Sequence, residues 1–455
     1  MPAIQGVYAR EILDSRGIPT VECTVWLVGG GIVVTSVPTG TSIGKFEALE
    51  LRDKDESRFV GKGVLKAVEN VNLQIAPKLV GQDPTHQAEI DQMLIELDAT
   101  ENRSNLGSNA IMAASQAVLK AGALSQNVPL YYYVWQKYGL CQQLTIPKCV
   151  YTIISGGEHG AGNLDIQEFQ IIPATHIDFA NSLNLAVTMF QKLEEVLVIK
   201  GAIRSVGLLG GFTPNLYSNT DAFEILIETT KATPYTFGQD LFFGIDAAAS
   251  SFFENGVYKL KDRSEGYSAK ELLEYYKSIK DLYHVFYIED PFREDDTAMW
   301  KQLTKEIGET TRIIGDSLLA TNKEKTAQAI ADKTCNSILI KPNQVGTISE
   351  TIDVIKVARA AGWEITVSHR SGETNDDLIV DLAVGVGAES VKFGPPNRGE
   401  RSAKYNRLLQ IDDEIKHWQS QKQTQVQPVR PVQVSTPKQN DPTATITKTQ
   451  TPASE

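Results

Sequence analysis

Cysteine is scarce in this chain, with four residues in a total of 455. They are scattered at Cys23, Cys141, Cys149 and Cys335, and no two of them form a CxxC pair. A disulfide framework or a zinc site uses cysteines at paired, close spacings, so the sequence argues against both. Reduced thiols are typical of cytoplasmic proteins, and we expect a cytoplasmic location.

A long apolar run and an excess of basic residues are also missing. No window approaches the ~20 apolar residues of a membrane span, and the first residues include no apolar signal region. Lys and Arg number 44 against 56 Asp and Glu, which gives a formal net charge of -12. This argues against nucleic acid as the main partner, because phosphate neutralisation needs clustered Lys and Arg. An anionic small substrate stays compatible with the composition, since local charge matters more than the total.

The character of the sequence changes twice along the chain. Residues 1–135 begin with three β-rich runs and continue with helical periodicity, which predicts a small α+β domain of three strands followed by helices. Residues 141–417 alternate strands with helices, which indicates a parallel sheet of the (β/α)8 barrel type. Residues 418–455 are rich in Gln, Thr and Pro, and we expect a disordered tail.

Short apolar runs in the second half of the chain end in charged or polar residues. In chain order these residues are Asp246, Glu289, Asp316, Lys341, His369, Arg370, Ser371 and Lys392. Runs of this length and composition are strands, and in a (β/α)8 barrel the strand ends converge on one face. Charges that merely begin solvated loops would follow no order, whereas here three carboxylates precede a lysine, a His-Arg-Ser segment and a second lysine. We interpret this face as an active site.

The three carboxylates at Asp246, Glu289 and Asp316 predict a bound cation. Without one they would repel each other, and oxygen ligands with no Cys or His nearby favour Mg²⁺. A lysine close to other cations can act as a base, and the His-Arg-Ser segment offers donors for a phosphate or carboxylate. This combination predicts proton abstraction next to a carboxylate, with a metal that stabilises the resulting ene-diolate.

Separated motifs along the chain resemble the enolase (phosphopyruvate hydratase) family, from residue 5 to about residue 416. They are AREILDSRGIPTVE, VPTGTSIGKFEALELRD, GKG, NLGSNAI, SGGEHGAGN, QEF, IEDPF, ILIKPNQVGT, VSHRSGET and RSAKYNRLL. So many blocks in one order make the resemblance specific. It implies a Mg²⁺-dependent lyase of glycolysis that interconverts 2-phosphoglycerate and phosphoenolpyruvate, and a homodimer or a ring of dimers.

The resemblance also implies the metal ligands. Asp246, Glu289 and Asp316 would hold a first Mg²⁺. A second Mg²⁺ site would be completed by the substrate and by a mobile lid loop. Thr39 of this loop stands where the family has a serine, and threonine keeps the hydroxyl group.

Catalytic and substrate-binding roles follow from the same resemblance. Lys341 would remove the C2 proton of the substrate, and Glu168 would assist near the leaving hydroxyl. Arg370 and Ser371 would grip the phosphate, and Lys392 would bind on the carboxylate side. The other residues expected at the substrate are His159, which we count as catalytic, Gln167 and His369. For His159, an ordinary loop histidine remains the alternative.

The chain departs from the family in the segment VGLLGGF. Leu208 and Leu209 replace an Asp-Glu pair, and the lost Glu is the family's general acid. Leucine has no proton to give to a departing hydroxide, so dehydration should lose at least the ~10²–10⁴-fold that general acid catalysis supplies. Ser317 also replaces a usual Asp, and the lid loop differs at Thr41 and Ile43.

Three interpretations therefore stay open. In the first, a substitute acid rescues dehydration, and the candidates are Glu158, Glu168, His159 and His369. In the second, the chain is an enolase-like pseudoenzyme that acts as a scaffold or binding protein. In the third, it is a lyase or racemase for another carboxylate, although a phosphate-gripping segment argues against a wide range of substrates.

Overall fold

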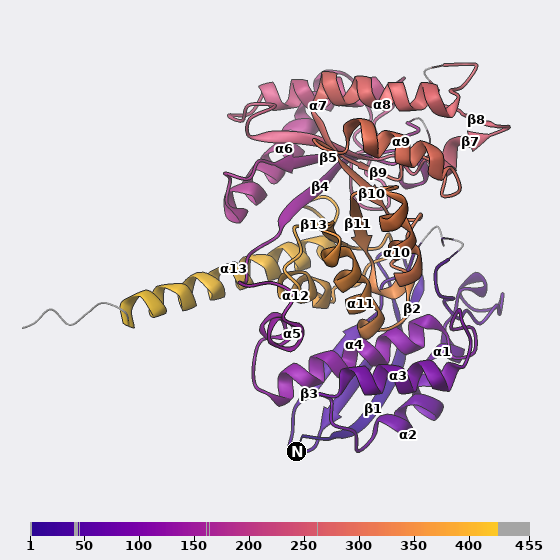
Figure 1. Ribbon diagram of the computed structural model, residues 1–455, viewed down its shortest axis with the longest axis vertical. Coiled ribbons are helices and arrows are strands. Elements are labelled where there is room, and N and C mark those ends of the chain that lie inside the picture. The colour runs from indigo at the N-terminus through magenta and orange to yellow at the C-terminus, as the bar shows by residue number, and fades with distance from the viewer. Residues whose placement is uncertain are drawn as a thin grey trace, which may run out of the picture. The chain divides into compact units, whose positions relative to one another are not determined.

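The computed structural model describes residues 2–40, 44, 46–160, 162, 164–261 and 263–425. Residues 1–415 form one compact unit, and residues 416–455 belong to a second. The first unit contains a three-stranded sheet and a closed eight-stranded barrel, each packed with helices (Figure 1). The predicted fold, a small α+β domain followed by a (β/α)8-type barrel, is confirmed.

The N-terminal sheet is antiparallel, with its strands in the order β1-β2-β3. The strands are β1 (Ile4–Leu13), β2 (Pro19–Leu27) and β3 (Ile32–Ser36). The helices that follow are α1 (Leu65–Asn70), a π-helical segment (Val71–Ile75), α2 (Ala76–Leu79), α3 (Gln87–Asp98), α4 (Ser108–Ser125) and α5 (Leu130–Tyr138). Along β2 the buried residues Val21, Cys23 and Val25 alternate with less buried ones, because one face of the strand packs on α4.

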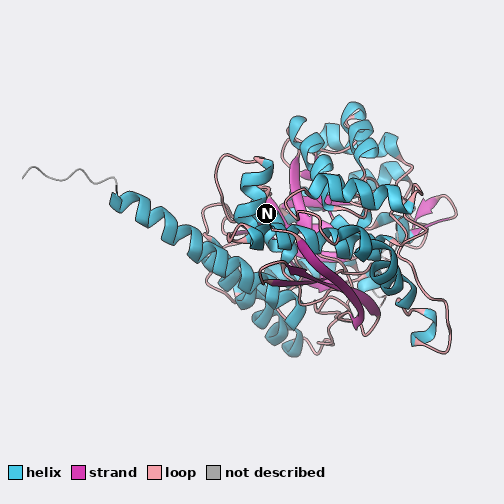
Figure 2. Cartoon of the chain, turned by 90° about the horizontal axis from the view of Figure 1, so that it is seen from below, coloured by secondary structure: helices cyan, strands magenta, loops and turns pink. Residues whose placement is uncertain are grey.

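The barrel closes in the order β10-β11-β12-β13-β4-β5-β6-β9. Its strands are β4 (Lys148–Ser155), β5 (Glu168–Pro173), β6 (Leu241–Asp246), β9 (Val285–Glu289), β10 (Arg312–Gly315), β11 (Ser337–Ile340), β12 (Glu364–Ser368) and β13 (Ser390–Lys392). Each apolar run that we singled out in the sequence is one of these strands. Figure 2 shows helices (cyan) packed around the strands (magenta).

The expectation of a wholly parallel barrel is wrong at one strand, β5. It pairs antiparallel with both of its neighbours, β4 and β6. A parallel connection needs a crossover, usually through a helix, whereas the described part of the loop from β4 to β5 contains only a short 3-10 turn at Gly157–His159. The reversal has a consequence for the site. Glu168 begins β5, yet it lies opposite Asp246, which ends β6.

The barrel helices lie between consecutive strands or follow the last one. They are α6 (Phe179–Ile199), α7 (Asn219–Lys231), α8 (Ala269–Tyr283), α9 (Thr297–Ile307), α10 (Lys323–Asp332), α11 (Ile348–Ala360), α12 (Leu378–Gly385) and α13 (Gly399–Gln425). A short hairpin of β7 (Phe253–Glu254) and β8 (Val257–Tyr258) precedes α8. Capping boxes begin α7 at Ser218 and α8 at Ser268, which explains why these helices begin there.

A buried polar network joins the N-terminal domain to the barrel. Asp91 of α3 accepts hydrogen bonds from the backbone N–H (2.9 Å) and the hydroxyl (2.6 Å) of Ser349 in α11. Ser115 of α4 donates to Asp91 (2.6 Å) and accepts the backbone N–H of Ile348 (3.0 Å). The network therefore fixes the start of α11, which follows closely after Lys341 in the chain.

Helix α13 runs to Gln425, past the predicted boundary at residue 417. Residues 426–455, most of the tail predicted to be disordered, lie outside the described residues, and their disorder stays a prediction. The predicted limits at residues 135 and 141 also stay predictions. Within the described ranges, no helix is both long enough and apolar enough to cross a membrane.

An aromatic cluster behind β5 and β6 should contribute strongly to stability. The ring of Phe223 in α7 is fully buried, stacks on Tyr283 at 4.7 Å between centroids and meets Phe169 edge-on at 5.2 Å. Phe223→Ala would leave a cavity beside the strand that carries Glu168. We expect the free energy of unfolding to fall by about 3–5 kcal/mol. Urea unfolding followed by circular dichroism measures this loss.

Tyr217→Ala is the matched control for this substitution. Tyr217 precedes the same helix, and its side chain is 92% exposed. Its removal should change the free energy of unfolding by no more than about 0.5 kcal/mol. Similar losses in the two variants would contradict the role given to the cluster.

Candidate active site

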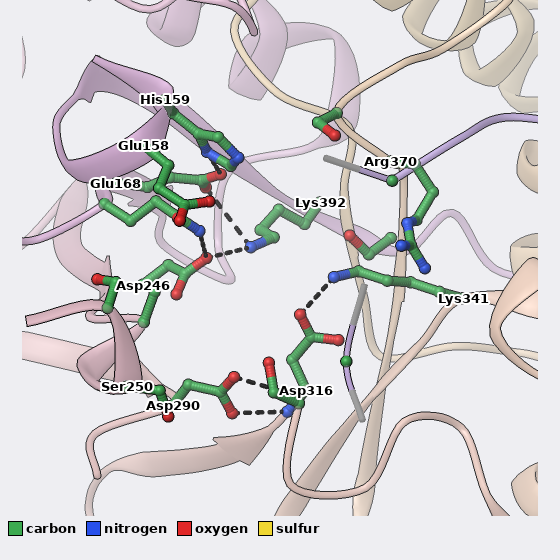
Figure 3. A pocket seen from close by; sticks show the side chains of 18 of the residues that line it. Glu158, His159, Glu168, Asp246, Ser250, Asp290, Asp316, Lys341, Arg370 and Lys392 are labelled. Carbon is green, nitrogen blue, oxygen red and sulfur yellow. Dashed lines mark hydrogen bonds and ion pairs between the residues drawn. The ribbon is translucent and has the colours of Figure 1, made fainter. Parts of the chain in front are cut away.

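A cavity of about 300 Å³ opens at the end of the barrel where most strands finish. The sequence-predicted residues that line it are His159, Gln167, Glu168, Asp246, Asp316, Lys341, His369, Arg370, Ser371 and Lys392. Because β5 runs in the reverse direction, Gln167 and Glu168 reach this end from the start of a strand. Figure 3 shows the tips of Lys341 and Lys392 directed toward carboxylates on the cavity wall.

Lys392 is the centre of the charge arrangement. Its Nζ lies 2.6 Å from Glu289 Oε2, 3.3 Å from Asp246 Oδ2 and 3.5 Å from Glu168 Oε2, and the side chain is 3% exposed. Burial alone would lower the pKa of Lys392, but the three carboxylates outweigh it and hold that pKa well above its usual value. The ammonium group is therefore a permanent positive charge that draws three strand ends together.

Glu289 lies beneath the cavity rather than on its wall. Burial and the neighbouring charge of Asp246 raise the pKa of Glu289 well above its usual value. Its Oε2 is bound to Lys392, whereas its Oε1 is buried and has no hydrogen-bond partner within the part of the chain that is described.

Asp316 and Lys341 form a second, partly buried ion pair across the cavity. Burial would raise the pKa of Asp316, but the ammonium group of Lys341 outweighs it and lowers that pKa. Asp290 supports the pair from behind, since its carboxylate accepts the backbone N–H groups of Asp316 (3.0 Å) and Ser317 (2.9 Å). Asp290 has a φ of 44°, a left-handed conformation that non-glycine residues adopt rarely, and these hydrogen bonds help to hold it.

The carboxylates fit a Mg²⁺ site by donor type, because Mg²⁺ prefers oxygen ligands. Among the described residues, no three His, Cys, Asp or Glu side chains lie close enough together to hold a metal. The lysines explain this spacing, since Lys392 holds Asp246 and Glu289 while Lys341 holds Asp316. The unpartnered Oε1 of Glu289 leaves one buried oxygen ready for a cation. The residues therefore fit the ion, provided that the lysines release their partners.

The His-Arg-Ser segment after β12 has its own partners. Arg370 is buried and forms an ion pair with Glu47 at 2.8 Å. Burial would lower the pKa of Arg370, but the carboxylate of Glu47 outweighs it and raises that pKa. His369 Nδ1 accepts a hydrogen bond from Arg401, and burial with this positive neighbour holds the pKa of His369 well below its usual value. The imidazole is therefore neutral, and its other nitrogen, Nε2, carries the proton.

Glu168 is held firmly as an anion on the opposite wall. It accepts hydrogen bonds from Thr152 (2.8 Å) and Gln170 (3.0 Å), and His159 Nδ1 lies 3.3 Å from its Oε1. Burial would raise the pKa of Glu168, but Lys392 and His159 outweigh it and hold that pKa well below its usual value. Gln167, the preceding residue, donates to Asp246 Oδ2 at 3.1 Å.

Thr39 lies behind the cavity wall rather than on it. Its hydroxyl donates to Asp14 (2.6 Å) and accepts from Arg16 (2.5 Å), and its backbone pairs with Gly372. The metal-binding role expected for Thr39 stays a prediction. The lid-loop differences at residues 41 and 43 lie outside the described residues.

The segment with the two leucines keeps an ordered backbone. Phe212 pairs with β4, and the backbone N–H of Leu208 donates to the carbonyl of His159 at 3.2 Å. Leu209 is 1% exposed and lines the cavity, whereas Leu208 faces outward and is 38% exposed. A side chain with no proton to give therefore forms part of the wall that also contains His159 and Glu168.

Comparison with known protein families agrees with this geometry. Residues 4–134 match the family model for the enolase N-terminal domain, and residues 143–427 match the one for the enolase C-terminal TIM barrel domain. The chain belongs to the enolase family. The resemblance drawn from short motifs is thereby confirmed at the level of the family.

Two residues of this enolase-family site were not among the predicted site residues. Asp290 directly follows Glu289, and its place in the IEDPF motif was a usable signal. Glu47 follows the lid loop in the chain and reaches Arg370 from the N-terminal domain. Such a contact between distant segments leaves no spacing pattern in the sequence.

Removal of the central ammonium group should destabilise this enolase-family chain. Lys392→Met would leave Glu168, Asp246 and Glu289 buried without their shared cation. Breaking a buried ion pair on one side costs about 3–5 kcal/mol, and we expect a loss of that size in the free energy of unfolding. Urea unfolding in the presence of EDTA measures it.

Lys277→Met is the matched control for Lys392→Met. Lys277 also contacts two carboxylates, Glu274 and Glu306, but it does so at the surface. Water screens such pairs, so little change is expected. An equal decrease in the free energy of unfolding of both variants would contradict the idea that burial makes the Lys392 cluster more stabilising than a surface ion pair.

Proposed function

We propose that this enolase-family protein is a Mg²⁺-dependent lyase of glycolysis that acts on 2-phosphoglycerate and phosphoenolpyruvate. The observation that carries the proposal is the meeting of Lys341, Asp316 and Arg370 in one cavity. A base, a carboxylate and an anion-binding guanidinium group in this arrangement suit abstraction of a proton next to a carboxylate. The substrate is expected to carry a phosphate, because the family's substrate does.

Lys341 is the proposed base for the C2 proton. To act as the base, Lys341 must leave its ion pair with Asp316 and lose a proton to solvent, so that the lone pair of a neutral amine faces C2. Magnesium bound by Asp246, Glu289 and Asp316 would stabilise the negative charge that develops on the substrate carboxylate as the proton leaves.

The proposed phosphate site consists of Arg370, Ser371 and His369. Glu47 binds the guanidinium group of Arg370 in the structure, so a phosphate must take the place of a carboxylate partner. Arginine offers a fork of N–H donors that suits phosphate, and neutral His369 adds an uncharged donor. Burial in this cavity makes each of these hydrogen bonds stronger than it would be in water.

The proposed reaction lacks the family's acid for the second step. Leu209 replaces it, and two of the four substitutes are not in an acidic form, since Glu168 is held as an anion and His369 as a neutral imidazole. Glu168 accepts hydrogen bonds and faces an ammonium group, and His369 is held neutral by Arg401. Glu158 is exposed and lines the same cavity as Leu209. We infer that Glu158 is the substitute acid, ahead of His159.

A pseudoenzyme that serves as a scaffold or binding protein is the second candidate. The buried side chain of Leu209 in the cavity wall favours it, because an apolar group stands where the acid would be needed. The family also implies a homodimer or ring of dimers and a second Mg²⁺ near Thr39, and the cysteine pattern a cytoplasmic location. These stay proposals that need their own measurements.

Proton abstraction should be faster than dehydration in this protein. Lys341 acts before any acid is required, so the C2 hydrogen of 2-phosphoglycerate should exchange with solvent at least ~10²-fold faster than phosphoenolpyruvate forms. The measurement uses D₂O with Mg²⁺, following C2 deuteration by NMR and phosphoenolpyruvate by absorbance. Leu209→Glu should raise the rate of phosphoenolpyruvate formation toward the rate of C2 exchange.

Two variants control the exchange experiment. Lys341→Met should abolish both signals, and Leu208→Asp alone should change neither, because Leu208 faces outward. Equal rates of exchange and product formation in the natural chain would point to a fully working substitute acid. Absence of both signals would overturn the proposed activity and favour the binding protein.

Glu158→Gln tests the substitute acid. It should lower phosphoenolpyruvate formation by ~10²-fold or more and leave C2 exchange nearly unchanged, because only the second step needs the acid. Glu294→Gln is the control, since Glu294 lines the same cavity and burial raises its pKa. If Glu294→Gln instead lowered phosphoenolpyruvate formation and left C2 exchange unchanged, Glu294 would be the substitute acid.

A further inference from the structure

The buried guanidinium group of Arg370 already has an anionic partner in the same chain. Its Nη2 donates to Glu47 Oε2 at 2.8 Å, and the side chains of Arg370 and Glu47 are 5% and 9% exposed. Arg370 follows barrel strand β12, whereas Glu47 belongs to the N-terminal domain, and both line the cavity of the candidate active site. An external anion that enters this cavity therefore meets an arginine whose charge is already balanced.

This ion pair uses only part of the binding capacity of an arginine. Glu47 contacts the guanidinium group through one oxygen, and Nη1 donates to Asn343 Oδ1 at 3.4 Å, which is long for a hydrogen bond. Arginine binds carboxylates and phosphates most strongly when two parallel N–H groups bond to two oxygens. A tetrahedral dianion can accept both bonds and carries more charge than a carboxylate. It is therefore suited to displace Glu47.

Neutral donors hold the Glu47 carboxylate in place. Its Oε1 accepts the backbone N–H of Gly44 at 3.0 Å and the side-chain amide of Gln344 at 3.4 Å. Gln344 is 2% exposed, and its own carbonyl oxygen accepts the Thr321 hydroxyl at 2.6 Å. The carboxylate is thus directed at Arg370 before any ligand arrives. A group that is already held in position loses little entropy when it binds, so it is an effective competitor for an external anion.

Contact between the two domains does not depend on this ion pair. Asp91 and Ser349 join the domains in the buried network described above, and Lys120 of α4 binds Asp376 of the barrel domain at 2.8 Å. These groups do not line the cavity, whereas Glu47 and its partner do. The position of Glu47 therefore favours a role in ligand binding over a role in domain contact.

We propose that Glu47 is a built-in competitor for the anionic group of the substrate and sets the affinity that an anion needs to enter the site. The carboxylate leaves Arg370 when a phosphate group binds and returns when it departs, so the guanidinium charge is balanced in both states. Weakly bound monoanions, such as chloride, do not displace it. This inference rests on the proposed phosphate site at Arg370, but it needs no turnover and no metal.

The test measures the dissociation constant of sulfate, a tetrahedral dianion. The full-length protein is dialysed to equilibrium against radiolabelled sulfate in the presence of EDTA. Glu47→Gln keeps the shape of the side chain but removes its charge. It should tighten sulfate binding about tenfold or more, the factor that corresponds to one hydrogen bond to a charged group. Unchanged or weaker binding in Glu47→Gln would overturn the proposal.

Methyl sulfate, a monoanion, distinguishes displacement of Glu47 from simple repulsion. If Glu47 is displaced, both anions must break the same ion pair, and Glu47→Gln should tighten their binding by the same factor. If Glu47 stayed in place and only repelled the ligand, the gain in binding free energy would be about twice as large for the dianion, because Coulomb energy scales with charge. A sulfate factor near the square of the methyl sulfate factor would therefore contradict displacement.

Two further variants locate the effect. Glu350→Gln removes a carboxylate that also binds an arginine of the N-terminal domain, Arg103 at 2.6 Å, but outside the cavity. Its sulfate binding should equal that of the natural chain, and equal tightening in Glu350→Gln and Glu47→Gln would overturn the proposal. The double variant Glu47→Gln with Arg370→Met removes both charges of the pair together and should lose the sulfate site. Tight sulfate binding by the double variant would place the anion elsewhere and would also overturn the proposal.

Failure of this proposal and failure of the proposed function give different results. Sulfate binding requires no base, acid or metal, so a chain without lyase activity should still show the expected changes in affinity. A chain that converts 2-phosphoglycerate but shows the same sulfate affinity with and without the Glu47 carboxylate would keep the proposed function and refute the competitor.

Discussion

The active-site end of this barrel depends on one buried ammonium group. Lys392 comes from the last barrel strand and contacts carboxylates that begin β5 and end β6 and β9. Three acidic groups this close would otherwise repel one another in a medium that screens charge poorly. Their shared partner keeps the strand ends together and sets where Asp246, Glu289 and Glu168 lie. The second pair, Asp316 with Lys341, repeats the arrangement on the other side of the cavity.

Much of this architecture could be read from the sequence, because the signals are local. Short apolar runs locate β6 and β9 to β13, and the polar residue at the end of each run marks the end of the barrel that forms the site. The reversed direction of β5 could not be read in this way, since its composition is that of its parallel neighbours. Asp290 and Glu47 were missed because they act by contacts, one with two backbone N–H groups and one across domains.

Leu209 makes one wall of the cavity chemically different from the rest of the site. The groups suited to remove a proton and to bind an anion remain charged, buried and paired. The wall that also contains His159 and Glu168 includes a leucine on a backbone that is otherwise ordered. Replacement of a side chain on an intact loop is a smaller change than loss of the loop. The leucine is therefore accommodated on a loop whose backbone is ordered.

The contact between Glu47 and Arg370 has a further consequence for how such proteins diversify. The barrel carries the guanidinium group, but its counter-ion belongs to the N-terminal domain, and so does Thr39, which pairs with Gly372. Neither domain thus contains a finished anion site. An N-terminal domain without a carboxylate at the position of Glu47 would leave Arg370 buried and uncompensated, at a cost of about 3–5 kcal/mol. Electrostatics as well as packing therefore couples the two domains.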